Sequence, residues 1–140
     1  MRDYSKEYRR KEDAGIAKYG KREWNRMKRV KSNQYEKTKK GFVMRMYRNM
    51  KSRVTGVQKA KAHLYLGLEL MPKQEFYDLA LNDPDFNKLF TEYEDSGYDR
   101  KLAPTPDRVD SRRGYTVDNI DFVTHSVNSR NGCLSKYGLL

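Results

Sequence analysis

The first sustained hydrophobic pattern in the chain begins at Phe42. Apolar side chains recur from there at intervals of three and four residues, with arginine and asparagine at positions between them. This spacing places apolar residues along one face of a helix and basic residues along another. The pattern therefore predicts an amphipathic helix with one face on the core and a basic face outward. The apolar face consists of Phe42, Val43, Met46, Tyr47, Met50 and Val54.

The period changes at residues 63–70, where leucine occupies every second position. Alternation of this kind predicts a short half-buried strand. Pro72 then suits the first turn of a helix. The acidic sequence at 82–85 predicts the start of another helix, because carboxylates favour the positive end of a helix dipole. Gly97 marks the expected end of that second helix.

The last part of the chain predicts the order strand, loop, strand and helix. Residues 101–106 contain two prolines and form an extended lead-in, and residues 111–114 end in glycine, which suits a turn. Residues 120–123 are mainly apolar and predict the second strand. Thr124 or Ser126 then offers a hydroxyl that caps the following helix.

Composition limits the size of the core and indicates the compartment. Hydrophobic residues make up 36% of the 140 residues and charged residues 35%, so one small domain with polar extensions is expected. No apolar run is long enough to cross a membrane, and residues 1–20 lack the apolar centre of a signal peptide. Cys133 is the only cysteine, which excludes a disulfide framework. A reducing, cytoplasmic setting is therefore expected.

The positive charge is concentrated in the first part of the chain. Residues 1–53 contain 19 Lys/Arg against 6 Asp/Glu, a net charge of +13, whereas residues 54–140 contain 11 against 13, a net charge of −2. This asymmetry predicts a basic arm that binds the phosphates of nucleic acid, with a solvated tail as the alternative and a membrane surface disfavoured. The basic residues expected to contact nucleic acid are Arg22, Arg26, Lys28, Arg29, Lys39, Lys40, Arg45, Arg48, Arg112 and Arg113.

Three regions follow from these patterns. Residues 1–36 are a basic N-terminal arm, helical or partly disordered, because they offer little apolar surface to offset the entropy of ordering. Residues 37–97 form a helical scaffold that includes the short strand near 63–70. Residues 98–140 form the C-terminal unit.

Oxygen-bearing side chains in the C-terminal unit are candidates for metal ligands. Asp107 is expected at the end of a strand and Asn128 on the face of the following helix, where the two could converge. Such oxygens suit Mg²⁺ or Mn²⁺, because water and substrate phosphate complete the coordination of these ions. Aspartate and asparagine also occupy turns and caps for local reasons, so that interpretation stands beside the first. Asp110 is likewise a second ligand or a turn residue.

The segment from Thr105 to Asn128 also carries an ordered series of short motifs. These are Thr-Pro-Asp-Arg-Val-Asp at 105–110, Gly-Tyr-Thr at 114–116, Asp-Asn-Ile at 118–120, Val-Thr at 123–124 and Asn at 128. Together they resemble the signature of the HNH, or His-Me finger (ββα-metal), endonucleases, in particular a small phage subgroup of the homing-endonuclease type. The resemblance extends upstream and covers roughly residues 37–131.

The resemblance implies an α+β fold that ends in a compact ββα unit. It assigns Asp107 and Asn128 as metal ligands and Asn119 as the residue that braces the loop. Arg108 stands where the family has its general-base histidine; arginine stays protonated, so it cannot deprotonate a water, although it can hold a phosphate oxygen. His125 is an alternative base or phosphate contact, or a surface residue at the start of a helix.

Two functions are therefore expected. The first is a phage-type HNH-like DNA endonuclease or nickase that uses Mg²⁺ or Mn²⁺ and no organic cofactor, in the bacterial host cytoplasm if the protein is phage-encoded. The second, which the departure at Arg108 favours, is a protein that keeps the ββα scaffold and binds DNA, RNA or a ribonucleoprotein without cleaving it. A structural accessory protein whose basic arm packs on an acidic partner is a third possibility.

Overall fold

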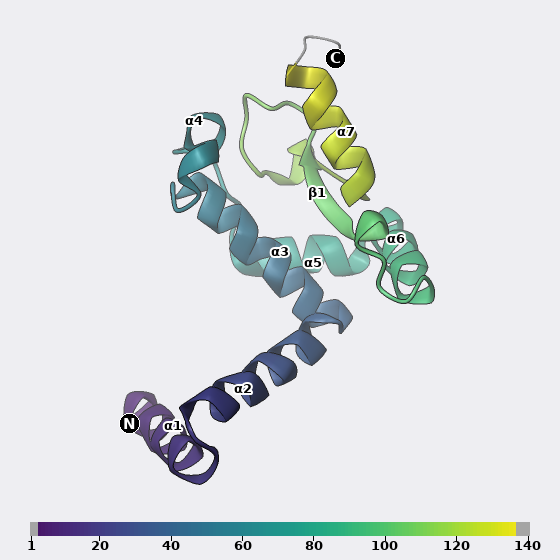
Figure 1. Ribbon diagram of the computed structural model, residues 1–140. Helices are drawn as coiled ribbons and strands as arrows, with labels where there is room; N and C mark the ends of the chain where they lie inside the picture. The colour runs from purple at the N-terminus through teal and green to yellow at the C-terminus, as the bar shows by residue number, and fades with distance from the viewer. Residues whose placement is uncertain (1–2, 137–140) are drawn as a thin grey trace. The chain divides into compact units, whose positions relative to one another are not determined.

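The computed structural model describes the backbone of residues 3–136 (Figure 1). Helices and a small two-stranded antiparallel sheet make up the fold, which belongs to the α+β class. The chain divides into two compact units, one ending at Lys37 and the other beginning at Thr38. Within the described residues, no helix is long and apolar enough to cross a membrane.

The first unit is a helical hairpin. It consists of α1 (Tyr4–Tyr19) and α2 (Lys21–Glu36), joined at Gly20, which has a φ of 81°. Gly15 in α1 is buried, and a Cβ added there would overlap the ring of Trp24. The carboxylate of Glu12 accepts hydrogen bonds from the indole N–H of Trp24 and from the Lys28 ammonium. A glycine contact and one central carboxylate therefore hold a hairpin that has little apolar surface.

The second unit begins with helices that build the core. These are α3 (Lys39–Val54), the 3₁₀ turn η1 (Lys59–Lys61), α4 (Ala62–Tyr65), α5 (Lys73–Asn82), α6 (Pro84–Asp95) and the 3₁₀ turn η2 (Arg100–Leu102). The Thr38 hydroxyl caps α3 by accepting from the Gly41 amide at 3.1 Å. Asp83 caps α6 by accepting from the Phe86 amide at 2.9 Å, which confirms the helix start predicted at 82–85.

The sheet and the last helix follow in the expected order. Strand β1 (Pro104–Arg108) pairs antiparallel with β2 (Ile120–Thr124), and the 3₁₀ turn η3 (Val117–Asn119) precedes β2. Helix α7 (His125–Lys136) continues directly from β2 and contacts both strands. The Thr124 hydroxyl accepts from the Val127 amide at 3.2 Å and caps α7. The C-terminal unit is thus strand, loop, strand and helix.

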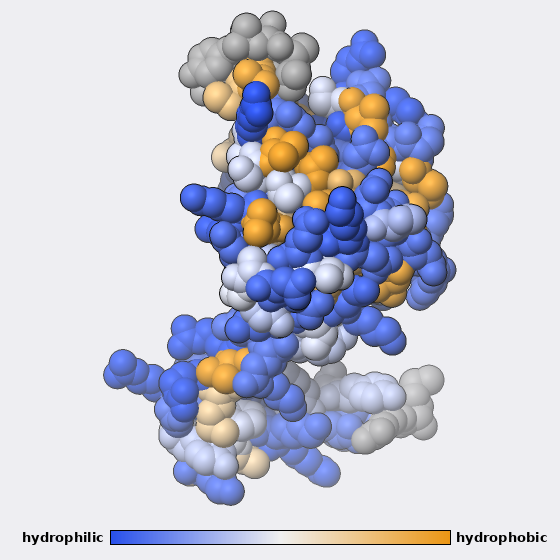
Figure 2. All heavy atoms as spheres, turned by 90° about the vertical axis from the view of Figure 1, so that its right-hand side faces the viewer, coloured by the Kyte–Doolittle hydropathy of each residue, from blue (hydrophilic) through white to orange (hydrophobic). Residues whose placement is uncertain are grey.

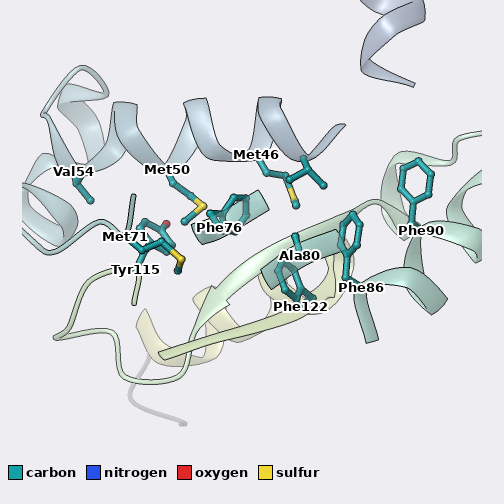
Figure 3. Close-up of a cluster of buried hydrophobic side chains, with 11 residues drawn as sticks. Met46, Met50, Val54, Met71, Phe76, Ala80, Phe86, Phe90, Tyr115 and Phe122 are labelled. Atoms are coloured by element: carbon teal, nitrogen blue, oxygen red, sulfur yellow. The ribbon is translucent and has the colours of Figure 1, made fainter. Parts of the chain in front are cut away.

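The core lies between α3, α5, α6 and the sheet (Figure 3). Met46, Met50 and Val54 point from α3 into the core, where Met50 lies beside Phe76 of α5, as the apolar pattern from Phe42 predicts. The sheet contributes to this core chiefly through the ring of Phe122 on β2. The fully or nearly buried apolar residues are Val43, Met46, Met50, Val54, Met71, Phe76, Ala80, Phe86, Phe90, Tyr115 and Phe122. Outside this core, apolar residues on the face in Figure 2 form patches separated by hydrophilic ones.

The prediction of a strand near residues 63–70 is wrong. Residues 62–65 form α4, and the Leu66 amide donates to the Ala62 carbonyl at 2.8 Å in a helical turn. Gly67 then has a φ of 77°, a left-handed conformation that interrupts any extended strand. Only Leu70 makes a β-bridge, a parallel one with Tyr115. The alternating leucines therefore do not share one strand face, and Leu64 and Leu66 are exposed.

Candidate functional site

Asn119 braces the loop that joins the two strands. Its side chain is buried; its Oδ1 accepts from the Asp110 amide at 2.8 Å, and its Nδ2 donates to the Asp110 and Gly114 carbonyls at 3.1 and 2.8 Å. The Val109 amide also donates to the Asn119 carbonyl at 3.0 Å. An amide side chain offers two N–H donors beside a carbonyl acceptor, so asparagine suits this position. These hydrogen bonds hold the two ends of the loop together around the Asn119 side chain.

Asp107 and Asn128 lie on elements that contact each other. Asp107 pairs with Asp121 across the hairpin, while Pro106 and Phe122, which face the core, form the adjacent pair. Successive strand residues point to opposite faces, so Asp107 points away from the core. Helix α7 contacts both strands, and Asn128 is half-buried on it between two exposed neighbours. The structure thus places both expected metal ligands on neighbouring elements.

A buried hydroxyl adds to this region. Thr105 lies two residues before Asp107 and therefore on the same face of β1. Its Oγ1 is buried and has no hydrogen-bond partner within the described residues. Unpaired buried polar atoms are uncommon because they lose their hydrogen bonds to water. A water or another polar ligand between β1 and α7 would satisfy this hydroxyl.

Asp107 and Asn128 are the residues that would hold a divalent cation in this unit. Asp107 and Asn128 each offer a side-chain oxygen, the ligand type that Mg²⁺ and Mn²⁺ prefer. Among the described residues, no group of three His, Cys, Asp or Glu side chains is arranged to hold a metal. A cation bound here would therefore take its remaining ligands from water and from substrate phosphate.

Arg108 lies against the rings of two tyrosines. Its Cζ lies 4.1 Å from the ring centroid of Tyr65 and 5.8 Å from that of Tyr115. Its Nη1 donates to the Arg113 carbonyl at 3.0 Å and to the Leu64 carbonyl at 3.4 Å. These contacts fix a protonated guanidinium at the position where the motif would carry a base. Arg108 can therefore bind an anion but cannot accept a proton.

Arg53 joins the same cluster from α3, although the sequence pattern did not single it out. Its Nη1 donates to the Tyr115 hydroxyl at 3.0 Å, and its Cζ lies 5.7 Å from the Tyr65 ring centroid. The two tyrosine rings are parallel within 8°, with centroids 6.1 Å apart. Burial raises the pKa of Tyr115, and the positive charge of Arg53 partly opposes this shift. The available signal was weak: Arg53 lies one residue before the end of α3, beside its apolar face, and Tyr115 belongs to the Gly-Tyr-Thr motif.

His125 lies at the end of the hairpin opposite Arg108. The His125 amide donates to the Ala103 carbonyl at 2.8 Å, at the end of the hairpin where Thr124 pairs with Pro104. Arg108 lies four residues further along β1, a separation of about 13 Å at roughly 3.3 Å per residue. His63 is exposed on α4. The structure therefore does not bring His125 together with Arg108.

Two ion pairs organise the loop around Asn119. Hydrogen bonds from the Arg112 side chain and amide to Asp110 lower the pKa of that carboxyl. Hydrogen bonds from Thr116 and from Arg113 lower the pKa of Asp118. Asp110 thus forms a turn with Arg112, as one of its two interpretations predicts. Arg112 and Arg113, which are expected to contact nucleic acid, are thus engaged in surface ion pairs, and such pairs exchange readily with other anions.

The remaining basic residues lie on two helices. On α2, Arg26 pairs with Glu23 at 2.5 Å and Lys28 pairs with Glu12, while Arg22 and Arg29 lie on one exposed face. On α3, Lys39 donates to Asn87 at 2.6 Å. Exposed positions on α3 include Lys40, Arg45 and Arg48.

Comparisons of the chain with protein-family models, with curated proteins and with solved structures find no match.

Proposed function

We propose that the C-terminal unit is an HNH-like ββα unit that binds DNA and, with a divalent metal ion, cleaves or nicks its phosphodiester backbone. One observation carries the proposal. The motif residues gather in a single strand–loop–strand–helix unit, in which buried Asn119 braces the loop. Asp107 and Asn128 lie on elements of that unit that contact each other.

The side chains have distinct proposed roles in this function. Asp107 and Asn128 hold Mg²⁺ or Mn²⁺, and no organic cofactor takes part. The ion, when bound, supplies positive charge that stabilises the reacting phosphate and the departing oxygen. Thr105 hydrogen-bonds a water or a phosphate oxygen beside Asp107, which satisfies its buried hydroxyl. Asn119 keeps the loop in place, so that the phosphate meets a preformed surface.

Basic residues outside the loop supply affinity in this proposal. The exposed face of α3 carries Lys40, Arg45 and Arg48, and α2 carries Arg22 and Arg29. Release of counterions from the nucleic acid makes such binding fall steeply as salt is added. The net charge of +11 on the chain supports a polyanionic partner, with double-stranded DNA as the first choice.

A second candidate function rests on Arg108. This residue is protonated and stacked on Tyr65 where a base would be needed, and His125 lies at the other end of the hairpin. A protein of this kind would bind DNA, RNA or a ribonucleoprotein through the same surfaces without cleaving it. Both candidate functions require the unit to bind phosphate. Only the nuclease must also remove a proton from the attacking water.

Plasmid nicking tests the first function. Wild-type protein is incubated with supercoiled DNA and Mg²⁺ or Mn²⁺, beside Asp107→Ala, Asn128→Ala and the control Asp95→Ala, which removes an exposed carboxylate at the end of α6. We expect metal-dependent nicking by wild type and by Asp95→Ala, and loss of nicking in the other two. Cleavage that survives both Asp107→Ala and Asn128→Ala rejects the assignment. Salt-sensitive binding without any cleavage supports the second candidate.

A further inference from the structure

We propose that Arg53 and Arg108, held against Tyr65 and Tyr115, form a binding site for one phosphate of a nucleic-acid backbone. The inference rests on the proposed function for the identity of the polymer and deepens it by naming where a phosphate binds. Arg108 follows Asp107 in β1, and successive strand side chains point to opposite faces. This site is therefore separate from the one proposed for the metal.

The first argument is charge without compensation. Both guanidinium Cζ atoms lie within 5.7 Å of the Tyr65 ring centroid. Within the described residues, the ion pairs involve other side chains, and neither Arg53 nor Arg108 has a carboxylate partner. Both positive charges contact the same ring, and their half-burial reduces screening by water. A bound anion would compensate these charges.

The second argument is the supply of unused donors. A guanidinium has five N–H donors. Among the described residues, Arg108 makes hydrogen bonds through Nη1 alone, toward two backbone carbonyls. Arg53 uses Nη1 for the Tyr115 hydroxyl, and its Nε is buried without a partner within the described residues. The two non-bridging oxygens of a phosphodiester match donors of this kind, because each oxygen accepts more than one hydrogen bond.

The third argument is that the donors are fixed in advance. Stacking on Tyr65 and the carbonyl contacts restrict Arg108, and the Tyr115 hydroxyl restricts Arg53. Arginine side chains on an open surface would lose this rotational freedom only on binding, at a cost in affinity. The arginines of this cluster have already lost that rotational freedom on folding, so its loss does not weaken binding. A preorganised arginine pair beside tyrosines is the arrangement expected of a phosphate site.

The surroundings favour nucleic acid over a small anion. Arg108 closes β1 at the loop that Asn119 braces, so the site adjoins the proposed ββα unit. Leu64 and Val109, which flank the arginine, are 50% and 67% exposed. Apolar side chains beside a phosphate site can contact sugars and bases while the arginines hold the backbone. A nucleic-acid chain can contact both the arginines and these apolar side chains, whereas free phosphate contacts the arginines alone.

Binding of labelled DNA across a range of salt concentrations tests the polymer. The variants are Arg53→Gln, Arg108→Gln and Arg108→Lys; the control Arg100→Gln removes the same charge from exposed η2. We expect each Gln variant of the pair to lose about tenfold in affinity. The slope of log affinity against log salt should fall by roughly 0.9 for a lost phosphate contact. Arg108→Lys should retain part of the affinity, and Arg100→Gln should retain nearly all of it.

An anion titration separates binding from folding. Sulfate, compared with chloride at equal ionic strength, should raise the unfolding temperature of wild type and Arg100→Gln but not of Arg108→Gln, because a ligand stabilises only the state that binds it. Equal DNA affinity, salt slope and sulfate response in Arg108→Gln and Arg100→Gln would overturn the inference, whether or not the protein cleaves DNA. If wild-type protein does not cleave DNA but Arg108→Gln still loses DNA affinity and the sulfate response, only the nuclease function is rejected and the phosphate site stands.

Discussion

Arg53 in α3 donates a hydrogen bond of 3.0 Å to the hydroxyl of Tyr115, 62 residues further along the chain. The contact joins the basic helix to the Gly-Tyr-Thr motif, and it does so beside the ring of Tyr65. The Tyr115 ring is buried in the core while its hydroxyl reaches the arginine cluster. One residue therefore links the stability of the second unit to its proposed phosphate site.

Replacement of Tyr115 by phenylalanine should change how stability depends on alkaline pH. Burial raises the pKa of Tyr115 above the ordinary 10.0, so the folded protein disfavours the phenolate. The stabilising contribution is complete below pH 10.0 and is lost as pH rises through the raised pKa. Tyr115→Phe should lose about 1–2 kcal/mol near neutral pH, because the bond from Arg53 is gone, but should decline less in alkali.

Urea unfolding at a series of pH values measures this effect. Tyr35→Phe is the control, because Tyr35 is exposed in the first unit. An equally steep alkaline decline in wild type and Tyr115→Phe would contradict the assignment of the effect to Tyr115.

Asn119→Ala should destabilise the second unit strongly. The substitution removes three hydrogen bonds and leaves backbone groups of Asp110 and Gly114 without their partner. Each buried polar group left unpaired costs about 1–3 kcal/mol, so a total loss of roughly 3 kcal/mol is expected. Asn49→Ala, at an exposed position on α3, should change stability by less than about 1 kcal/mol. Chemical denaturation compares the two, and similar small losses would show that Asn119 does not brace the loop.

Gly114→Ala should separate the segment at Glu69–Leu70 from the loop. A Cβ at position 114 would lie on the backbone of Glu69, whose carbonyl accepts from the Tyr115 amide at 2.7 Å. Backbone cannot move aside as a flexible side chain can, so a loss of about 2–4 kcal/mol is expected.

Gly132→Ala is the matched control for this substitution. Position 132 lies in α7, and no atom of the described residues occupies the space that its Cβ would enter, so alanine should be neutral or stabilising by up to about 1 kcal/mol. Thermal unfolding of both variants measures the contrast. A Gly114→Ala protein as stable as Gly132→Ala would contradict the close contact with Glu69.

Acidification should destabilise the loop around Asn119. The pKa values of Asp110 and Asp118 are lowered below the ordinary 3.8, the first chiefly by Arg112 and the second chiefly by Thr116. Their contribution to stability is therefore present above pH 3.8 and is lost as pH falls through the lowered values. The double variant Asp110→Asn, Asp118→Asn should lose less stability on acidification than wild type.

Amide hydrogen exchange in the loop, followed as pH falls and corrected for the intrinsic rate, measures the change directly. The Arg112 amide is the most informative probe, because it donates to Asp110 at 2.9 Å. Protection that falls equally in wild type and in the double variant would exclude these carboxylates as the cause.

Elements whose signals are local can be predicted from the linear pattern of residues. The period of three and four residues from Phe42 predicted the buried face of α3, and the acidic start at 82–85 predicted the cap of α6. The order strand, loop, strand and helix also followed from prolines, glycine and a hydroxyl cap. These features depend on contacts between residues a few positions apart, so the linear pattern contains them.

The arginine cluster, in contrast, depends on how distant segments pack together. Alternating leucines predicted a strand at 63–70, but the helical turn of α4 and the left-handed Gly67 placed Tyr65 on Arg108 instead. Arg53 entered the site because packing of α3 brought it to Tyr115. Such contacts join positions tens of residues apart and depend on how helices pack. Local periodicity cannot specify them, because it records which face of an element is apolar and not which element covers it.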